Sequence, residues 1–111
     1  MTTTVIKGNL IMEKDMEYDG DLIVEGDIFG KNGKKHNLKV NGNITAGDIT
    51  AGDIIANDIT ADDIKAINIH AGNISYYAIC FAYRSIKCKS IKGKRANSKH
   101  VVLDSKIEIT K

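Results

Sequence analysis

The chain has 111 residues and a formal net charge of +2; it lacks proline and tryptophan, and aromatic residues make up only 5% of it. This length fits one domain, no run of residues is apolar enough to span a membrane, and the beginning MTTTVIKGNL lacks the order of a signal peptide. Two cysteines cannot build a disulfide framework, and no phosphate loop, nucleophile elbow or HExxH motif occurs. The spacings of Cys80, Cys88, His70 and His100 match no zinc finger. We therefore expect a cytoplasmic protein that is not an enzyme and binds neither a metal nor a cofactor.

The first forty residues repeat one short string at irregular intervals. IKGNL at 6–10 matches VEGDI at 24–28 and VNGNI at 40–44, so the starts are 18 and 16 residues apart. The segment 29–37, FGKNGKKHN, interrupts the repeat and contains the turn-forming pair Asn32-Gly33. We predict irregular solenoid coils over 1–40, with a protruding basic loop at 29–37.

Residues 41–80 carry an isoleucine at every fifth position, from Ile44 to Ile79. Helices and strands repeat at about 3.6 and 2 residues, so a period of five indicates a β-solenoid with regular coils over 41–80. If each isoleucine points inward together with the alanine two residues later, only apolar side chains are buried. The other register would bury Asp62 without a partner, which costs several kcal/mol. The preferred register makes the Gly-Asp and Gly-Asn pairs corner residues.

A coil with four five-residue sides would place residues twenty apart directly above one another, about 4.8 Å apart. The predicted vertical pairs are Asp48–Asn68, Asp53–Asn73 and Asn43–Asp63. This alternation would keep like charges apart, although Asp and Asn could equally be interchangeable turn formers. The candidate acidic binding face consists of Asp48, Asp53, Asp58 and Asp63.

The period is lost in the stretch YYAICFAY at 76–83, where Ile86 follows Ile79 by seven residues. The inward column of small residues would continue from Ala71 to Tyr76 and Phe81. Because a solenoid end exposes apolar core and strand edges, it must be capped or covered. We predict a capped, non-repeat C-terminal segment over 81–111. The alternative is a homodimer or polymer contact, with the candidate interface residues Tyr76, Tyr77, Phe81 and Tyr83.

Charge is segregated along the chain. Residues 44–83 contain five acidic residues and one basic residue, whereas residues 84–111 contain nine basic and two acidic residues. A candidate basic binding face consists of Lys87, Lys89, Lys92, Lys94 and Arg95. Such a stripe could contact nucleic-acid phosphates, or it could be a solvated surface that keeps the protein soluble.

The five-residue units of 41–80 resemble those of pentapeptide-repeat proteins, with a shifted register, and the V-x-G-[DN]-I strings are similar to those of bactofilins. The first resemblance implies a right-handed square β-helix, in a family that includes inhibitors imitating DNA. The second implies a bacterial β-helix that polymerises end to end. Together with the repeats, these resemblances predict an all-β, single-domain, right-handed parallel β-helix with coils of about 20 residues.

Three functions are compatible with this sequence. The favoured one is a non-enzymatic binding protein, such as a phage or mobile-element inhibitor, that docks on a nucleic-acid-handling protein complex. The second is a self-assembling, bactofilin-like scaffold. The third is a nucleic-acid binder that uses the basic C-terminal stripe.

Overall fold

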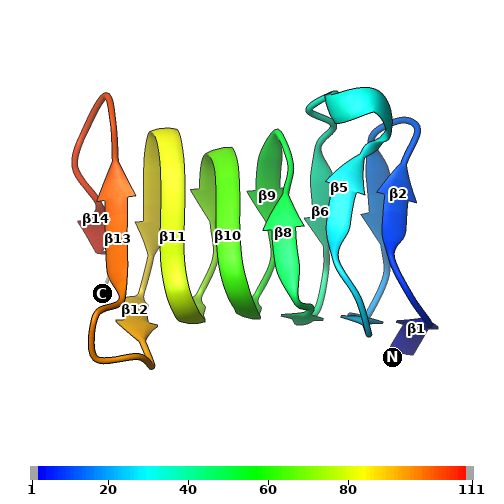
Figure 1. Ribbon diagram of the computed structural model, residues 1–111, viewed down its shortest axis with the longest axis horizontal. Helices are drawn as coiled ribbons and strands as arrows, with labels where there is room; N and C mark the ends of the chain where they lie inside the picture. Colours follow the sequence, from blue (N-terminus) through cyan, green and yellow to red (C-terminus); the bar gives the residue numbers. More distant parts are fainter. Residues whose placement is uncertain (1–2, 110–111) are drawn as a thin grey trace.

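In the computed structural model, which describes residues 3–109, every pairing between strands is parallel. The chain winds through three sides in turn and then passes to the next coil, so that these residues form a solenoid of about six coils (Figure 1). The two ends of the described chain lie at opposite ends of the stack. The predicted β-solenoid fold is therefore confirmed.

Each side of the solenoid is a parallel sheet. The long strands β10 (Asp58–His70) and β11 (Asn73–Cys88) turn two corners each and so take part in all three sheets. The first side also contains β1 (Thr3–Ile6), β4 (Asp21–Val24), β7 (Ile44–Thr45) and β12 (Ser90–Gly93). The second side contains β2 (Leu10–Met12), β5 (Ile28–Gly30), β8 (Asp48–Thr50) and β13 (Lys99–Val102). The third side contains β3 (Met16–Tyr18), β6 (Leu38–Val40), β9 (Asp53–Ile55) and β14 (Glu108–Ile109).

The regular coils are shorter than predicted, because each has three five-residue sides where four were expected; over the described solenoid a coil averages about 17 residues. Ile44, Ile59 and Ile74 stand in register on the first side, 15 residues apart. The vertical pairs predicted from a 20-residue coil are therefore wrong. The observed pairs are Asp48–Asp63, Asp53–Asn68 and Asn43–Asp58. A period of five fixes the length of one side, whereas the angle at each corner decides how many sides close a coil.

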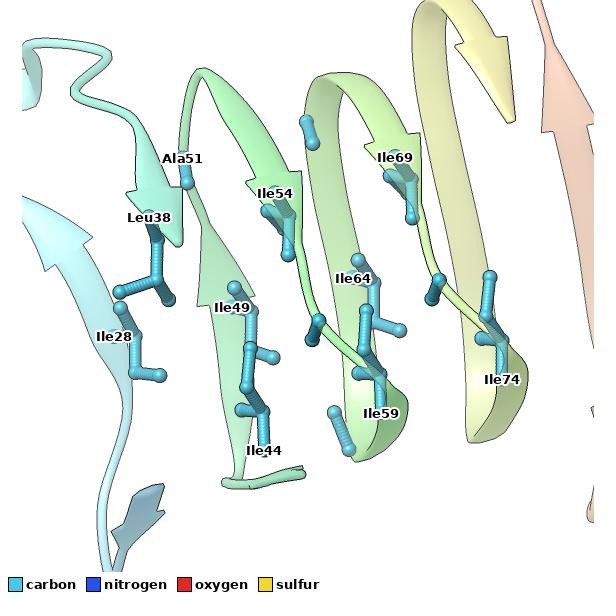
Figure 2. Close-up of a cluster of buried hydrophobic side chains, with 14 of the residues drawn as sticks. Ile28, Leu38, Ile44, Ile49, Ala51, Ile54, Ile59, Ile64, Ile69 and Ile74 are labelled. Atoms are coloured by element: carbon cyan, nitrogen blue, oxygen red, sulfur yellow. The ribbon is translucent and has the colours of Figure 1, made fainter. Parts of the chain in front are cut away.

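The predicted inward register is confirmed in the regular coils. The isoleucines at every fifth position from Ile44 to Ile74 point into the interior, as Figure 2 shows, and each is at most 1% exposed. Ala51, Ala56, Ala61, Ala66 and Ala71 lie beside them and are also buried. Each isoleucine contributes about 1.5–3 kcal/mol through burial, and the alanines keep the coil narrow enough for the isoleucines of facing sides to meet.

The isoleucine column ends before Ile79, which is 45% exposed. In β11 the inward positions pass instead to Cys80 and Ala82, while Phe81 points outward. The first of two register shifts between β10 and β11 causes this change, because the spacing between paired residues grows from 15 at Ala61–Tyr76 to 16 at Asp63–Ile79; the second shift follows Ala82 and raises the spacing to 17. Each shift adds one residue at a corner and so turns the following side chains by one position.

The basic loop predicted at 29–37 is present over most of that range. Strand β5 continues to Gly30, and a 3₁₀ turn, η1 (Lys31–Gly33), opens the connection to β6. Asn32 and Gly33 both have positive φ, at 57° and 76°, which fits the turn chemistry of this pair.

Residues 81–88, predicted to begin a C-terminal cap, complete β11 instead. The strands β12, β13 and β14 then add a further coil on top of β11. The described chain therefore finishes as one more coil of the solenoid. It has longer corners than the regular coils because the turn at 94–98 and the segment 103–107 separate its strands.

Candidate interaction surfaces

Aspartate and asparagine side chains at the corners bind the backbone of the next coil. On the first side, Asp21 accepts a hydrogen bond from the N–H of Asn43 (2.9 Å), and Asn43 accepts one from the N–H of Asp58 (3.2 Å). Asp58 in turn accepts one from the N–H of Asn73 (3.0 Å). Similar ladders run along the second side through Asn9, Asp27, Asp48 and Asp63, and along the third through Asp15, Asn37, Asp53 and Asn68. These carboxylates and amides satisfy backbone donors where the strands end, so they have a structural role.

Like charges are kept apart on two sides, but they are stacked on the second. The ladders of the first and third sides alternate Asp and Asn, whereas Asp27, Asp48 and Asp63 follow one another on the second. Partial burial raises the pKa of Asp48, as do the nearby charges of Asp63, Asp27 and Asp62; a hydrogen bond from the Asp63 backbone opposes this rise in pKa. Of the three ladders, that of the second side is therefore the one in which aspartates follow one another.

The four residues of the predicted acidic face do not lie on one surface. Asp48 and Asp63 are stacked at the corner of the second side, whereas Asp53 lies on the third side and Asp58 on the first. The cause is the length of one side, because side chains five residues apart lie at successive corners and only residues fifteen apart, such as Asp48 and Asp63, return to the same corner. A ligand that touches one corner cannot reach all four carboxylates along a straight line.

The predicted aromatic interface is divided between the core and the surface. Tyr76 is 1% exposed and its hydroxyl lies 2.6 Å from Nδ1 of His100, so it belongs to the core. Tyr77 is half exposed at a corner. Phe81 and Tyr83 lie on the outside of the second side, where their rings pack edge to face at 5.0 Å.

Three aliphatic residues that sequence reasoning missed adjoin these rings. Ile79, Val101 and Leu103 are 45%, 44% and 63% exposed, and Val101 is paired directly with Phe81 on the neighbouring strand. The signal that could have found Val101 and Leu103 is the run VVL at 101–103, because an alternating strand with one buried face contains polar residues at outward positions.

The predicted basic residues surround the C-terminal coil, and they do not line a single side. Lys87 lies at the end of β11 on the third side, 3.8 Å from a carboxylate oxygen of Glu108. Lys89 follows at a corner, Lys92 lies on β12, and Lys94 and Arg95 begin the next turn. All five side chains are exposed. The structure thus brings these charges together as a ring around one end of the solenoid.

Both ends of the described solenoid leave strand edges open. β1, β2 and β3 pair only with strands of the second coil, and β12, β13 and β14 pair only with β11. Core side chains at both ends are only partly covered: Ile6, Met16 and Tyr18 at one end, Ile91, Val102 and Ile107 at the other. We call the coil of β1, β2 and β3 the N-terminal end and the coil of β12, β13 and β14 the C-terminal end.

Among residues 3–109, no three His, Cys, Asp or Glu side chains group as a metal site would require. A shallow groove of about 300 Å³ on the third side is lined by Ile55, His70, Lys87 and Glu108, among others. Burial raises the pKa of Cys80 to about 12, so its thiol stays protonated and is a poor nucleophile near neutral pH.

No helix in residues 3–109 is both long and apolar enough to cross a membrane. Comparison of the chain with protein-family models, with curated proteins and with solved structures finds no match. The function of this chain is therefore inferred from its fold and its surfaces.

Proposed function

We propose that the protein is a non-enzymatic structural protein that self-associates through the ends of its solenoid. The observation that carries this proposal is the pair of open ends, each with three strands whose outer edges lack a partner in residues 3–109. Unpaired N–H and C=O groups on a strand edge attract another strand. Proteins that stay monomeric usually cover such edges with a helix or a loop, and neither covers the ends described above.

The partly covered core at each end supports the same proposal. Ile6 and Met16 at the N-terminal end, and Ile91 and Val102 at the C-terminal end, lie in the inward columns that are fully buried in the middle coils. Contact with another coil would remove these apolar surfaces from water, at a gain of about 25 cal/mol for each Å². The similarity of the V-x-G-[DN]-I strings to bactofilins points in the same direction.

Light scattering over a wide range of concentrations tests this function. We expect the average mass to rise with concentration, and electron microscopy to show rods at the highest concentrations. Val101→Lys, which places a charge at the C-terminal end, is expected to shift the protein toward monomer. Ile55→Lys is the matched control, because Ile55 is also 44% exposed but lies in a middle coil. A wild-type protein that stays strictly monomeric contradicts the proposal.

Nucleic-acid binding is a second candidate, supported by the ring of basic side chains at the C-terminal end. Lys92 on β12 and Lys94 and Arg95 at the turn after β12 are exposed and close together in sequence. If they contact phosphates, affinity for DNA or RNA falls steeply as salt rises. Replacing all three with glutamine should flatten this dependence and leave the fold intact, since exposed charges contribute little to stability. Binding that does not change in this variant contradicts the hypothesis.

The inhibitor hypothesis, in which a phage or mobile-element protein docks on a nucleic-acid-handling complex, has less support from the surface. Its acidic face would have to span different corners of the coil. It predicts that Asp48→Lys combined with Asp53→Lys abolishes inhibition of such a complex, whereas the glutamine variant of the basic ring does not. A pull-down with and without nuclease would identify the complex.

A further inference from the structure

We infer that the copies associate head to tail, with the C-terminal end of one chain on the N-terminal end of the next. This inference rests on the proposed end-to-end association and adds its polarity and its register. Because the described solenoid has all its strands parallel, such a contact would continue the three parallel sheets from one molecule into the next. The contact is heterologous and does not close, so it gives rods of unlimited length.

Charge distinguishes the head-to-tail contact from the two symmetric ones. The N-terminal coil, residues 3–20, contains four acidic and two basic residues, and the C-terminal coil, residues 89–109, contains six basic and two acidic residues. A contact between two N-terminal ends would oppose acidic surfaces, and a contact between two C-terminal ends would oppose basic ones. Only the head-to-tail contact brings opposite charges together.

The third side gives this complementarity at the level of single residues. Following the strand register from coil to coil, Lys106 occupies the same corner column as Asp15. Lys106 of one copy would therefore lie against Asp15 of the next. Two like-charged contacts also form. Glu108 lies against the next copy's Glu17, but Lys87 lies 3.8 Å from Glu108 and offsets its charge. Lys94 lies against the next copy's Lys7 at the corner after the first side.

An outward row on the second side supports the same junction independently of charge. In the middle coils this row contains Thr50 and Lys65, which suit an exposed surface. At the two ends it contains apolar side chains: Ile11 beside Phe29 at the N-terminal end, and Phe81 beside Val101 at the C-terminal end. Head-to-tail stacking would place Val101 beside the next copy's Ile11 and join the two apolar pairs.

Disulfide trapping tests the polarity and the register together. Neighbouring parallel strands are about 4.8 Å apart, within the range of Cα separations that a disulfide bridges. Ile11→Cys and Val101→Cys are introduced in two separate chains that differ in mass through a tag. The buried native thiols stay in place, and the unmodified protein serves as the blank. Ile11 and Val101 are 50% and 44% exposed, so neither change should disturb the core.

Head-to-tail stacking predicts that the mixture of the two variants forms a cross-linked heterodimer, while each variant alone stays uncross-linked. A chain with both substitutions should give a ladder of multimers. Ile55→Cys, in a middle coil, should not cross-link. Rising salt should weaken the association, because it screens attraction between opposite charges.

Other outcomes separate this inference from the proposed function. Cross-linked homodimers of Ile11→Cys or Val101→Cys alone would show a symmetric contact, which overturns the polarity and leaves end-to-end association standing. Assembly by light scattering without any cross-link overturns the register. An association that grows stronger with salt also contradicts the inference. A protein that remains monomeric throughout overturns the proposed function and the polarity together.

Discussion

Ile59 lies in the middle of its buried column, with Ile44 on one neighbouring coil and Ile74 on the other. We expect Ile59→Asp to unfold the protein, because it buries an unpaired charge and removes about 1.5–3 kcal/mol of apolar burial. Chemical denaturation followed by circular dichroism measures this effect. Ile55→Asp is the control, because Ile55 is 44% exposed on the outer face of β9. A folded, cooperative Ile59→Asp variant would mean that this position tolerates water.

Asp48 stands between Asp27 and Asp63, so its negative charge meets two others along the corner ladder. Asp48→Asn keeps an acceptor for the backbone and removes this repulsion. At neutral pH we expect a gain in stability on the order of a few tenths of a kcal/mol, as for other facing like charges in sheets. Asp58→Asn is the control, since Asp58 lies between two asparagines.

The gain from Asp48→Asn should depend on pH in a defined direction. Because the pKa of Asp48 is raised in the folded protein, its ionisation favours the unfolded chain. The gain is therefore present at neutral pH and disappears as the pH falls below about 4, where Asp is protonated in both states. Thermal unfolding of both proteins at pH 7 and pH 3 measures this; a gain of equal size at both values would exclude charge repulsion as its cause.

Cys80 is 0% exposed and its pKa is raised to about 12. A thiol reagent at pH 8 should therefore leave it unmodified in the folded protein and modify it rapidly in denaturant. Between pH 9 and 12 the unfolded chain loses this proton more readily, so stability should fall as pH rises. The slope should be smaller in Cys80→Ala. Fast modification of Cys80 under native conditions would show that the C-terminal coils open readily.

The sequence predicts which side chains of the regular coils point inward, because Ile and Ala at fixed positions leave only one apolar register. The same reasoning fails after Tyr76. There one extra residue at the corner after Tyr76 shifts the inward positions to Cys80 and Ala82, and Phe81 turns outward. Ile79 still follows Ile74 by five residues although it now points outward, so the isoleucine spacing reveals the shift only at Ile86.

At the scale of elements, the connection between β5 and β6 is an insertion at one corner. In the next coil the corresponding corner needs only Gly52 between Ala51 and Asp53. We expect replacement of residues 31–36 with a single glycine to leave the fold intact and to change the free energy of unfolding by less than about 1 kcal/mol. The ion pair of Lys31 with Glu13 would be lost, but both side chains are well exposed, and such pairs contribute little.

Circular dichroism and thermal unfolding check this deletion. The backbone carbonyl at position 36, which accepts a hydrogen bond from the N–H of Gly52 (2.7 Å), is retained by the remaining glycine. Loss of cooperative unfolding would show that the loop holds the second coil together.

The number of sides in a coil could not be obtained from the period. Every multiple of five residues keeps isoleucine inward, so coils of 15 and 20 residues satisfy the sequence equally well. Backbone turning at the corners, at residues such as Gly47 and Gly52, closes the coil after three sides. That number decides which acidic residues share a corner: three sides stack Asp48 on Asp63, whereas four sides would have stacked Asp48 on Asn68.

At the scale of the whole molecule, a coil should behave as a unit that can be copied. We expect insertion of a second copy of residues 58–72 after Gly72, with asparagine at the copied positions 58 and 63, to give a folded protein about 4.8 Å longer. X-ray scattering measures the length, and thermal unfolding measures the stability. A copy that lacks its last residue should not fold, because every following side chain would be turned to the other face.

Paired coils are close together in the sequence, and this affects how the chain can fold while it is being synthesised. Neighbouring coils are joined by hydrogen bonds in which at least one partner is a side chain. These bonds join residues that are 15 to 24 positions apart in the sequence. A nascent chain can therefore form its first sheet contacts once about two coils have left the ribosome, and each later coil can add to a preformed template. The N-terminal end is completed first, so it is available to another molecule while the C-terminal end is still being synthesised.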